Sequence, residues 1–259
     1  MVLPHDEAGV GPAVVLLHAG VADRTMWAEQ LPTLAAAGYR AVAMDLPGFG
    51  EAPPVKEFQP WSDVLGTMDA LELPEAALVG NSFGGAVALN VAVVAPERIT
   101  SLMLVSAPPP GLEPSSELGA AWEAEESALE RGDIEAAVRA VVDAWTLPDA
   151  PSELRDRVAG MQRRAFELQA EADDRSEAAE PAEAGPDALG RIDVPVLVAS
   201  GEFDLPDFRL GAESLSKRLE DARGTVIAGA GHLAPLEQPE AFERLLLEFL
   251  NESNESMRP

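Results

Sequence analysis

Ten consecutive residues carry the clearest structural signal in this chain: Ala76-Ala77-Leu78-Val79-Gly80-Asn81-Ser82-Phe83-Gly84-Gly85. The first four are apolar, as in a buried strand, and residues 86–93 are apolar apart from one asparagine, as in a buried helix. Gly80 and Gly84 stand two positions on either side of Ser82, where a tight strand-to-helix turn leaves no room for side chains. The pattern predicts a serine at a helix N-terminus, which stabilises developing negative charge. A glycine-rich turn with a purely structural role is the alternative.

Further apolar runs of strand length lie on both sides of this stretch, separated by segments with helical spacing of apolar residues. Runs that are apolar on both faces are typical of a parallel sheet covered by helices on both sides. We therefore predict an α/β fold with a mostly parallel, doubly wound sheet of about seven strands flanked by helices. The runs lie at 13–17, 40–44, 76–79, 102–105, 194–199 and 225–228, and helices are expected at 27–37, 60–72, 83–95, 209–219 and 238–250.

This alternation stops in residues 113–191, which contain no strand-like run and place their apolar residues at helical spacing. We predict that residues 1–112 and 192–259 form the core and that 113–191 form an all-helical insert, with a charged return loop at 171–186. The insert carries 20 acidic and 8 basic residues, so it is nearly twice as acidic per residue as the rest of the chain. Solvated faces of amphipathic helices account for such charges.

The composition excludes several classes of function. The net charge of −27 argues against nucleic acid, which is bound by basic residues, and against anionic membrane surfaces. The absence of cysteine excludes disulfides, thiolate nucleophiles and Cys-ligated zinc. No apolar run has the length of a membrane helix, and the start of the chain lacks the basic segment of a secretory signal. We therefore expect a cytoplasmic protein; the sequence leaves self-association open.

Four more motifs follow the ends of expected strands: Leu16-Leu17-His18-Ala19-Gly20, Asp45-Leu46-Pro47-Gly48-Phe49-Gly50, Gly201-Glu202-Phe203-Asp204 and Gly229-Ala230-Gly231-His232. With the motif at Ser82 and in this order, they make most of the chain resemble the α/β-hydrolase fold family, in particular its serine esterase and enol-lactonase-like members. The insert lies where that family places its helical lid. Such a set of motifs is specific for the fold and only weakly specific for the substrate.

The resemblance implies a catalytic triad in the family order serine, acid, histidine, with Ser82 as nucleophile, Asp204 as acid and His232 as base. Two other histidines are alternative bases, although the family uses the one after the first apolar run structurally. Three other carboxylates are alternative acids. The alternative bases are His5 and His18, and the alternative acids are Glu113, Glu202 and Asp207.

The resemblance also implies an oxyanion hole made by the backbone N–H groups of Phe83 and Gly20. The family usually has His-Gly at the first loop, whereas this chain has His18-Ala19-Gly20, so Val21 is an alternative donor. In the insert, four apolar side chains either cover the pocket or pack one helix on another. They are Trp122, Trp145, Met161 and Phe166.

The activity implied is hydrolysis of carboxylic esters or lactones through an acyl-enzyme, with a small-molecule substrate and without a metal or organic cofactor. Ser82 disfavours epoxide hydrolase and haloalkane dehalogenase chemistry, for which the family uses an aspartate at this turn. Carbon–carbon bond hydrolysis, thioester hydrolysis and cofactor-free perhydrolysis use the same triad and stay open. A ligand receptor with slow or no turnover is the alternative from another class.

Overall fold

The computed structural model describes residues 1–170, 176–185 and 187–256, and it contains the predicted mostly parallel sheet. Seven strands lie in the order β1-β3-β2-β5-β6-β8-β9, and all neighbours are parallel except β1 and β3. The expectation of an α/β fold with about seven strands is confirmed. The strands are β1 His5–Ala8, β2 Ala13–Leu17, β3 Arg40–Met44, β5 Ala76–Asn81, β6 Ile99–Val105, β8 Val196–Gly201 and β9 Ala222–Ile227.

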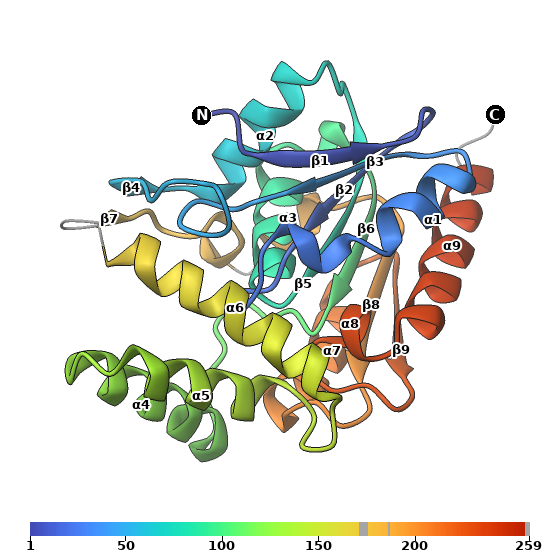
Figure 1. Cartoon of the computed structure of the whole chain (residues 1–259). Helices are drawn as coiled ribbons and strands as arrows, with labels where there is room; N and C mark the ends of the chain where they lie inside the picture. The colour runs from blue at the N-terminus through green and yellow to red at the C-terminus, as the bar shows by residue number, and fades with distance from the viewer. Residues whose placement is uncertain (171–175, 186, 257–259) are drawn as a thin grey trace.

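Helices cover both faces of the sheet, as Figure 1 shows. Helices α1 (Gln30–Ala36) and α9 (Pro239–Ser256) pack on the face that buries Val14 and Leu16. The opposite face, which buries Val15 and Leu17, is covered by three helices. Successive residues of β2 are therefore buried on opposite faces, which explains its unbroken apolar run. The three helices are α2 (Pro60–Ala70), α3 (Phe83–Val94) and α7 (Pro206–Arg218).

Helix boundaries differ from the expected ones at both ends of the chain. The helix expected at 27–37 is divided into a 3-10 turn at Arg24–Trp27, which Asp23 caps by accepting from Thr25 N, and helix α1. The helix expected at 238–250 continues to Ser256 as α9. The short helical segments in the rest of the described chain are Pro96–Arg98, Pro181–Glu183, Leu189–Arg191 and α8 (Ala234–Glu237).

Three helices, α4 (Ser116–Glu130), α5 (Ile134–Trp145) and α6 (Ser152–Gln169), follow β6 in the chain and form a separate layer beside the sheet (Figure 1). One short strand departs from the helical pattern expected here: β7 (Ser176–Glu177) pairs in parallel with β4 (Glu57–Phe58). The expected return loop at 171–186 lies outside the described residues at 171–175 and 186. Within the described part of the chain, no helix combines the length and apolarity that crossing a membrane requires.

The turn between β5 and α3 has the strained geometry that the sequence predicts. Ser82 has φ of 52° and ψ of −118°, a conformation that L-residues rarely adopt. A Cβ on Gly84 would lie 2.5 Å from the carbonyl oxygen of His18 and closer still to that of Leu17. The turn is therefore packed directly against the end of β2, and only glycine fits at position 84.

We expect Gly84→Ala to lower the free energy of unfolding by about 3 kcal/mol, because the new methyl group displaces the backbone of a central strand. Gly160→Ala is the matched control, since Gly160 is exposed in α6 and a Cβ there meets nothing within 4 Å. That substitution should raise stability by about 0.5 to 1 kcal/mol, through helix propensity. Chemical denaturation measures both, and equal effects at the two positions would contradict the packing argument.

Candidate active site

The site lies where the strand order of the sheet reverses. From β2 the chain proceeds to β3 on one side, whereas β5 adds on the other side of β2. The loop after β2, with Gly20, and the turn after β5, with Ser82, therefore leave the carboxyl edge of neighbouring strands. In open α/β sheets such a reversal creates the crevice in which ligands bind. Ser82 N donates to Val105 O on β6 at 2.8 Å, which ties the turn to the next strand.

Three side chains from separate loops meet at this crevice. Ser82 Oγ lies 2.8 Å from His232 Nε2, and His232 Nδ1 lies 2.9 Å from Asp204 Oδ1. Because an aspartate carboxylate only accepts, Nδ1–H donates to Asp204 and leaves Nε2 of the neutral ring to accept from the Ser82 hydroxyl. Asp204 Oδ1 also accepts from Leu205 N at 2.8 Å. The geometry is that of a serine next to a base whose ring is oriented by a buried carboxylate.

Two polar side chains hold the His232 loop in place. The Asn81 amide, fully buried beside Ser82, donates to Val105 O and to His232 O, each at 3.1 Å. Glu237 accepts from Gly231 N at 2.7 Å and from Leu147 N, which follows α5, at 3.0 Å. Burial raises the pKa of the Glu237 carboxyl, although these two N–H groups act in the opposite direction.

Aromatic rings enclose the imidazole of His232 on two sides. The ring centroid of Phe208, on α7, lies 4.3 Å from that of His232, and the centroid of Trp145, on α5, lies 4.5 Å from it. Only 6% of His232 is exposed to solvent. The imidazole is therefore largely shielded from bulk water, which strengthens its hydrogen bonds to both partners.

The alternative acids have other partners or other positions. Asp207 accepts from the N–H and hydroxyl of Ser115, both at 2.7 Å, at the start of α4. Glu202 accepts from Gly229 N at 2.9 Å, and Glu113 is exposed. Among the four predicted carboxylates, Asp204 is thus the one that contacts His232.

The two alternative bases lie away from Ser82. His5, the first residue of β1, makes a hydrogen bond with Leu3 O, just before the strand. His18 is fully buried, donates from Nδ1 to Ala19 O at 2.8 Å and accepts at Nε2 from Leu46 N at 2.9 Å. Burial lowers the pKa of His18, although its bond to Ala19 opposes this. Because Nε2 accepts a hydrogen bond, it carries no proton, and both ring nitrogens have partners. His18 therefore supports the loop that contains Gly20.

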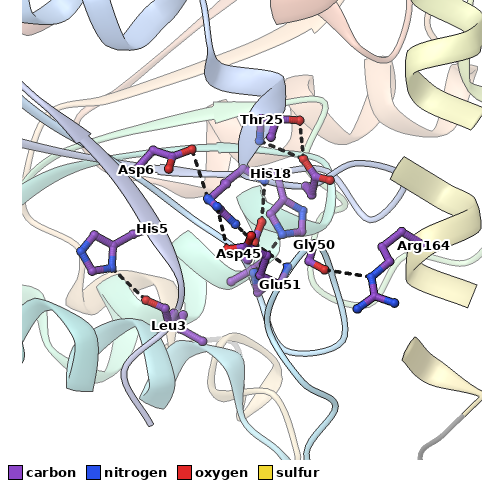
Figure 2. Close-up of polar contacts among 12 residues, drawn as sticks. Leu3, His5, Asp6, His18, Thr25, Asp45, Gly50, Glu51 and Arg164 are labelled. Carbon is purple, nitrogen blue, oxygen red and sulfur yellow. Dashed lines mark hydrogen bonds and ion pairs between the residues drawn. The ribbon is translucent and has the colours of Figure 1, made fainter. Parts of the chain in front are cut away.

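A charged network lies next to His18 and stabilises the same loop (Figure 2). The fully buried Asp45 accepts from the backbone N–H groups of Arg24 and Glu51, each at 2.8 Å, and pairs with the Arg24 guanidinium. Asp6 and Glu51 form further ion pairs with Arg24. Burial disfavours the charge of Arg24, but these carboxylates outweigh burial and raise its pKa above the usual range.

Ser82 and His232 open into a cavity of about 410 Å³ between the sheet edge and helices α4–α6. Gly20, Val21 and Phe83 all line it, so both candidate positions for the second oxyanion N–H lie at the cavity wall. A Cβ on Gly20 would lie 3.4 Å from Phe83 Cβ, so the two residues are close neighbours. Among the described residues, no group of three or more His, Asp or Glu side chains is arranged to hold a metal ion.

The four insert residues named from the sequence divide into two pairs. Trp122 and Trp145 line the cavity, whereas Met161 and Phe166 do not; Trp145 also belongs to the hydrophobic core that buries Met161 and Phe166. The sequence does not predict the other residues of the site, because they stand in no recognisable local motif. Phe208 and Glu237 contact the His232 loop, and Glu125 and Gln162 line the cavity.

Part of the chain is similar in sequence to curated hydrolases. Over 109 residues the chain is 38% identical to a 2-hydroxy-6-oxo-6-phenylhexa-2,4-dienoate hydrolase of Comamonas testosteroni, an alignment that covers 39% of this chain and 38% of that protein. Alignments with three curated relatives span between 20% and 38% of the relatives' own length.

Solved structures match nearly the whole chain. A thermophilic esterase from Thermogutta terrifontis is 25% identical with a TM-score of 0.76, over 97% of this chain and 93% of that one. The enol-lactonase from Burkholderia xenovorans is 26% identical with a TM-score of 0.75, over 96% of both chains. The family model described as alpha/beta hydrolase fold matches residues 12–239. The chain therefore belongs to the α/β-hydrolase fold family.

Proposed function

We propose that this protein is a serine hydrolase that cleaves carboxylic esters or lactones through an acyl-enzyme, with Ser82 as nucleophile, His232 as base and Asp204 as the orienting acid. The observation that carries the proposal is the continuous hydrogen-bonded relay from Ser82 Oγ through the imidazole to Asp204, open to a cavity. A serine hydroxyl is a weak nucleophile until a neighbouring base takes its proton, and this relay supplies that base.

In the first half of the proposed reaction, Ser82 Oγ attacks the substrate carbonyl carbon while its proton passes to His232 Nε2. The carbonyl oxygen becomes an oxyanion, which the N–H groups of Phe83 and Gly20 stabilise in this scheme. Asp204 stabilises the imidazolium that forms. The C–O bond then breaks as His232 returns the proton to the leaving alkoxide, which departs as an alcohol or, for a lactone, stays attached through the acyl chain.

In the second half, water enters the cavity and attacks the acyl carbon. His232 Nε2 takes one proton from this water and then gives it to Ser82 Oγ as the acyl-oxygen bond breaks. The products are a carboxylic acid and the free enzyme. The helices α4–α6 would act as a lid in this cycle, because Trp145 covers the imidazole and Trp122 lines the same cavity.

Carbon–carbon bond hydrolysis is the second candidate, and the 38% identity to the dienoate hydrolase over 109 residues favours it. The esterase and the enol-lactonase, at 25% and 26% identity over nearly the full chain, support ester or lactone cleavage as the first choice. Turnover of a short-chain nitrophenyl ester, an enol-lactone and a vinylogous diketone by the same preparation decides between the two.

We expect Ser82→Ala to lower kcat for a nitrophenyl ester at least about a thousandfold and to abolish labelling by a fluorophosphonate, because the attacking oxygen is lost. Ser106→Ala is the control, since Ser106 is also a buried serine with positive φ at the end of a neighbouring strand but makes no side-chain hydrogen bond within the described residues. Full activity of the Ser82 variant would overturn the proposal, and labelling that stops at one equivalent without turnover would indicate a receptor.

We also expect Glu237→Gln to lower kcat about tenfold with little change in KM, because an amide has a single acceptor oxygen for two N–H donors and the His232 loop shifts. Glu240→Gln removes the same charge from an exposed position three residues later and should leave kcat unchanged. Steady-state kinetics of both variants test this positioning role. A rise in KM of the Glu237 variant at unchanged kcat would refute it.

A further inference from the structure

The cavity has a distinct polar wall on the side of the helical layer. Besides Ser82 and His232, its titratable lining residues are Glu125, Glu180 and Glu183, and the lining residues that the structure describes include no lysine or arginine. Glu180 and Glu183 already accept hydrogen bonds, from Asn90 Nδ2 at 3.4 Å and from Gly111 N at 3.2 Å. Glu125 is different, because no N–H group of the described residues donates to its carboxyl.

Glu125 lies on α4 and is partly buried at the cavity wall, while Glu123 and Glu126 on the same helix are exposed. Its carboxyl makes no hydrogen bond or ion pair with the part of the chain that the structure describes. Burial raises the pKa of this carboxyl, so its ionised form costs folding stability that no partner within the described residues restores. An unpaired, partly buried acid facing a cavity is therefore a site for a ligand of opposite charge.

Gln162 provides an independent observation on another helix of the same layer. It lies on α6, lines the same cavity and is 3% exposed, and its Oε1 has no hydrogen-bond partner among the described residues. A buried amide oxygen without a partner is unfavourable unless a ligand supplies one. An oxygen dipole of this kind attracts a positively charged group.

Aromatic rings complete this wall. Trp122 precedes Glu125 by three residues on α4, so the two side chains share one face of the helix. Trp122 and Trp145 both line the cavity, and Trp122 is 44% exposed, unusual for a large aromatic residue. The faces of tryptophan rings attract cations, and combinations of such rings with a carboxylate recognise alkylated ammonium groups.

We propose that the cavity selects esters or lactones that carry an alkylammonium cation remote from the reacting carbonyl, with Glu125 as its anionic partner and with Trp122 and Gln162 beside it. The proposal rests on the proposed hydrolase function and names the substrate class of that site. A carboxylate at the same place in the substrate would face Glu125 without a basic residue of the cavity wall to compensate it.

Three nitrophenyl esters of matched size test this selectivity. One carries a γ-dimethylammonio-butyryl group, whose N–H can donate to Gln162 Oε1, the second replaces the cation by an isopropyl group, and the third is the half-ester of glutarate. For the wild-type protein we expect kcat/KM for the cationic ester to exceed that for the neutral ester at least about tenfold, and the anionic ester to be poorer than the neutral one.

The variants Glu125→Gln and Glu126→Gln separate a contact from the general acidity of the protein. Glu125→Gln should reduce the ratio of kcat/KM for the cationic ester to kcat/KM for the neutral ester about tenfold. This variant should melt no lower than the wild type, because an unpaired, partly buried charge is removed. Glu126→Gln should leave the ratio unchanged. Because salt at about 1 M reduces the screening length to about 3 Å, the selectivity of a direct contact should persist there.

Three results would overturn the proposal. The wild type shows no preference for the cationic ester, the Glu125 and Glu126 variants lose this preference equally, or the wild type loses it at high salt. Binding of the cationic and neutral esters to the Ser82→Ala protein, followed by tryptophan fluorescence, keeps this test separate from catalysis. Tighter binding of the cationic ester without turnover by the wild type would refute the hydrolase function and retain the cation site. Turnover of the neutral ester without cation preference would refute only the cation site.

Discussion

The close packing between the turn at Ser82 and the end of β2 is the constraint on which the rest of the site depends. Carbonyl groups of Leu17 and His18 occupy the space that a side chain at position 84 would need. This contact sets the loop with Gly20 against the turn with Ser82 at the reversal of strand order. Asn81 then binds the backbone of His232 from the same turn. Serine, first loop and histidine loop are thereby fixed as one unit, and the network around Asp45 supports that unit from outside.

The central strands could be predicted from the sequence because a strand covered by helices on both faces requires an unbroken apolar run. β2, β3, β5 and β6 all carry such runs. The edge strands lack this signal. β1 consists of His5-Asp6-Glu7-Ala8 and is partly exposed. The first half of β9 contains the exposed Arg223 and Gly224, so its apolar run marks only the second half of the strand. An edge strand pairs with one neighbour and is partly open to solvent, so fewer of its side chains need to be apolar than in a strand buried between two helical layers.

The candidate site was accessible to sequence reasoning for a different reason. Ser82, Asp204 and His232 each stand in a short glycine-containing motif after a strand, and parallel strands end at one edge of the sheet. Glu237 has no such local signal, because its structural role depends on a hydrogen bond from Leu147, which is 90 residues away in sequence. Glu125 resembles its exposed neighbours until packing determines which carboxylate faces the cavity. Local motifs thus identify the proposed reacting groups, and tertiary contacts decide what surrounds them.

The link between Glu237 and Leu147 connects the helical layer to the loop that carries the imidazole. Trp145 lies on the ring, and two residues later Leu147 donates to the carboxylate that also holds Gly231. A displacement of α5 that admits a substrate would remove one wall of the imidazole and one partner of Glu237 in a single movement. The molecule in its open form would then be chemically idle, and bond cleavage would be confined to the interval in which the helices exclude bulk water. Substrate would enter only in the open form, and bond cleavage would occur only in the closed form.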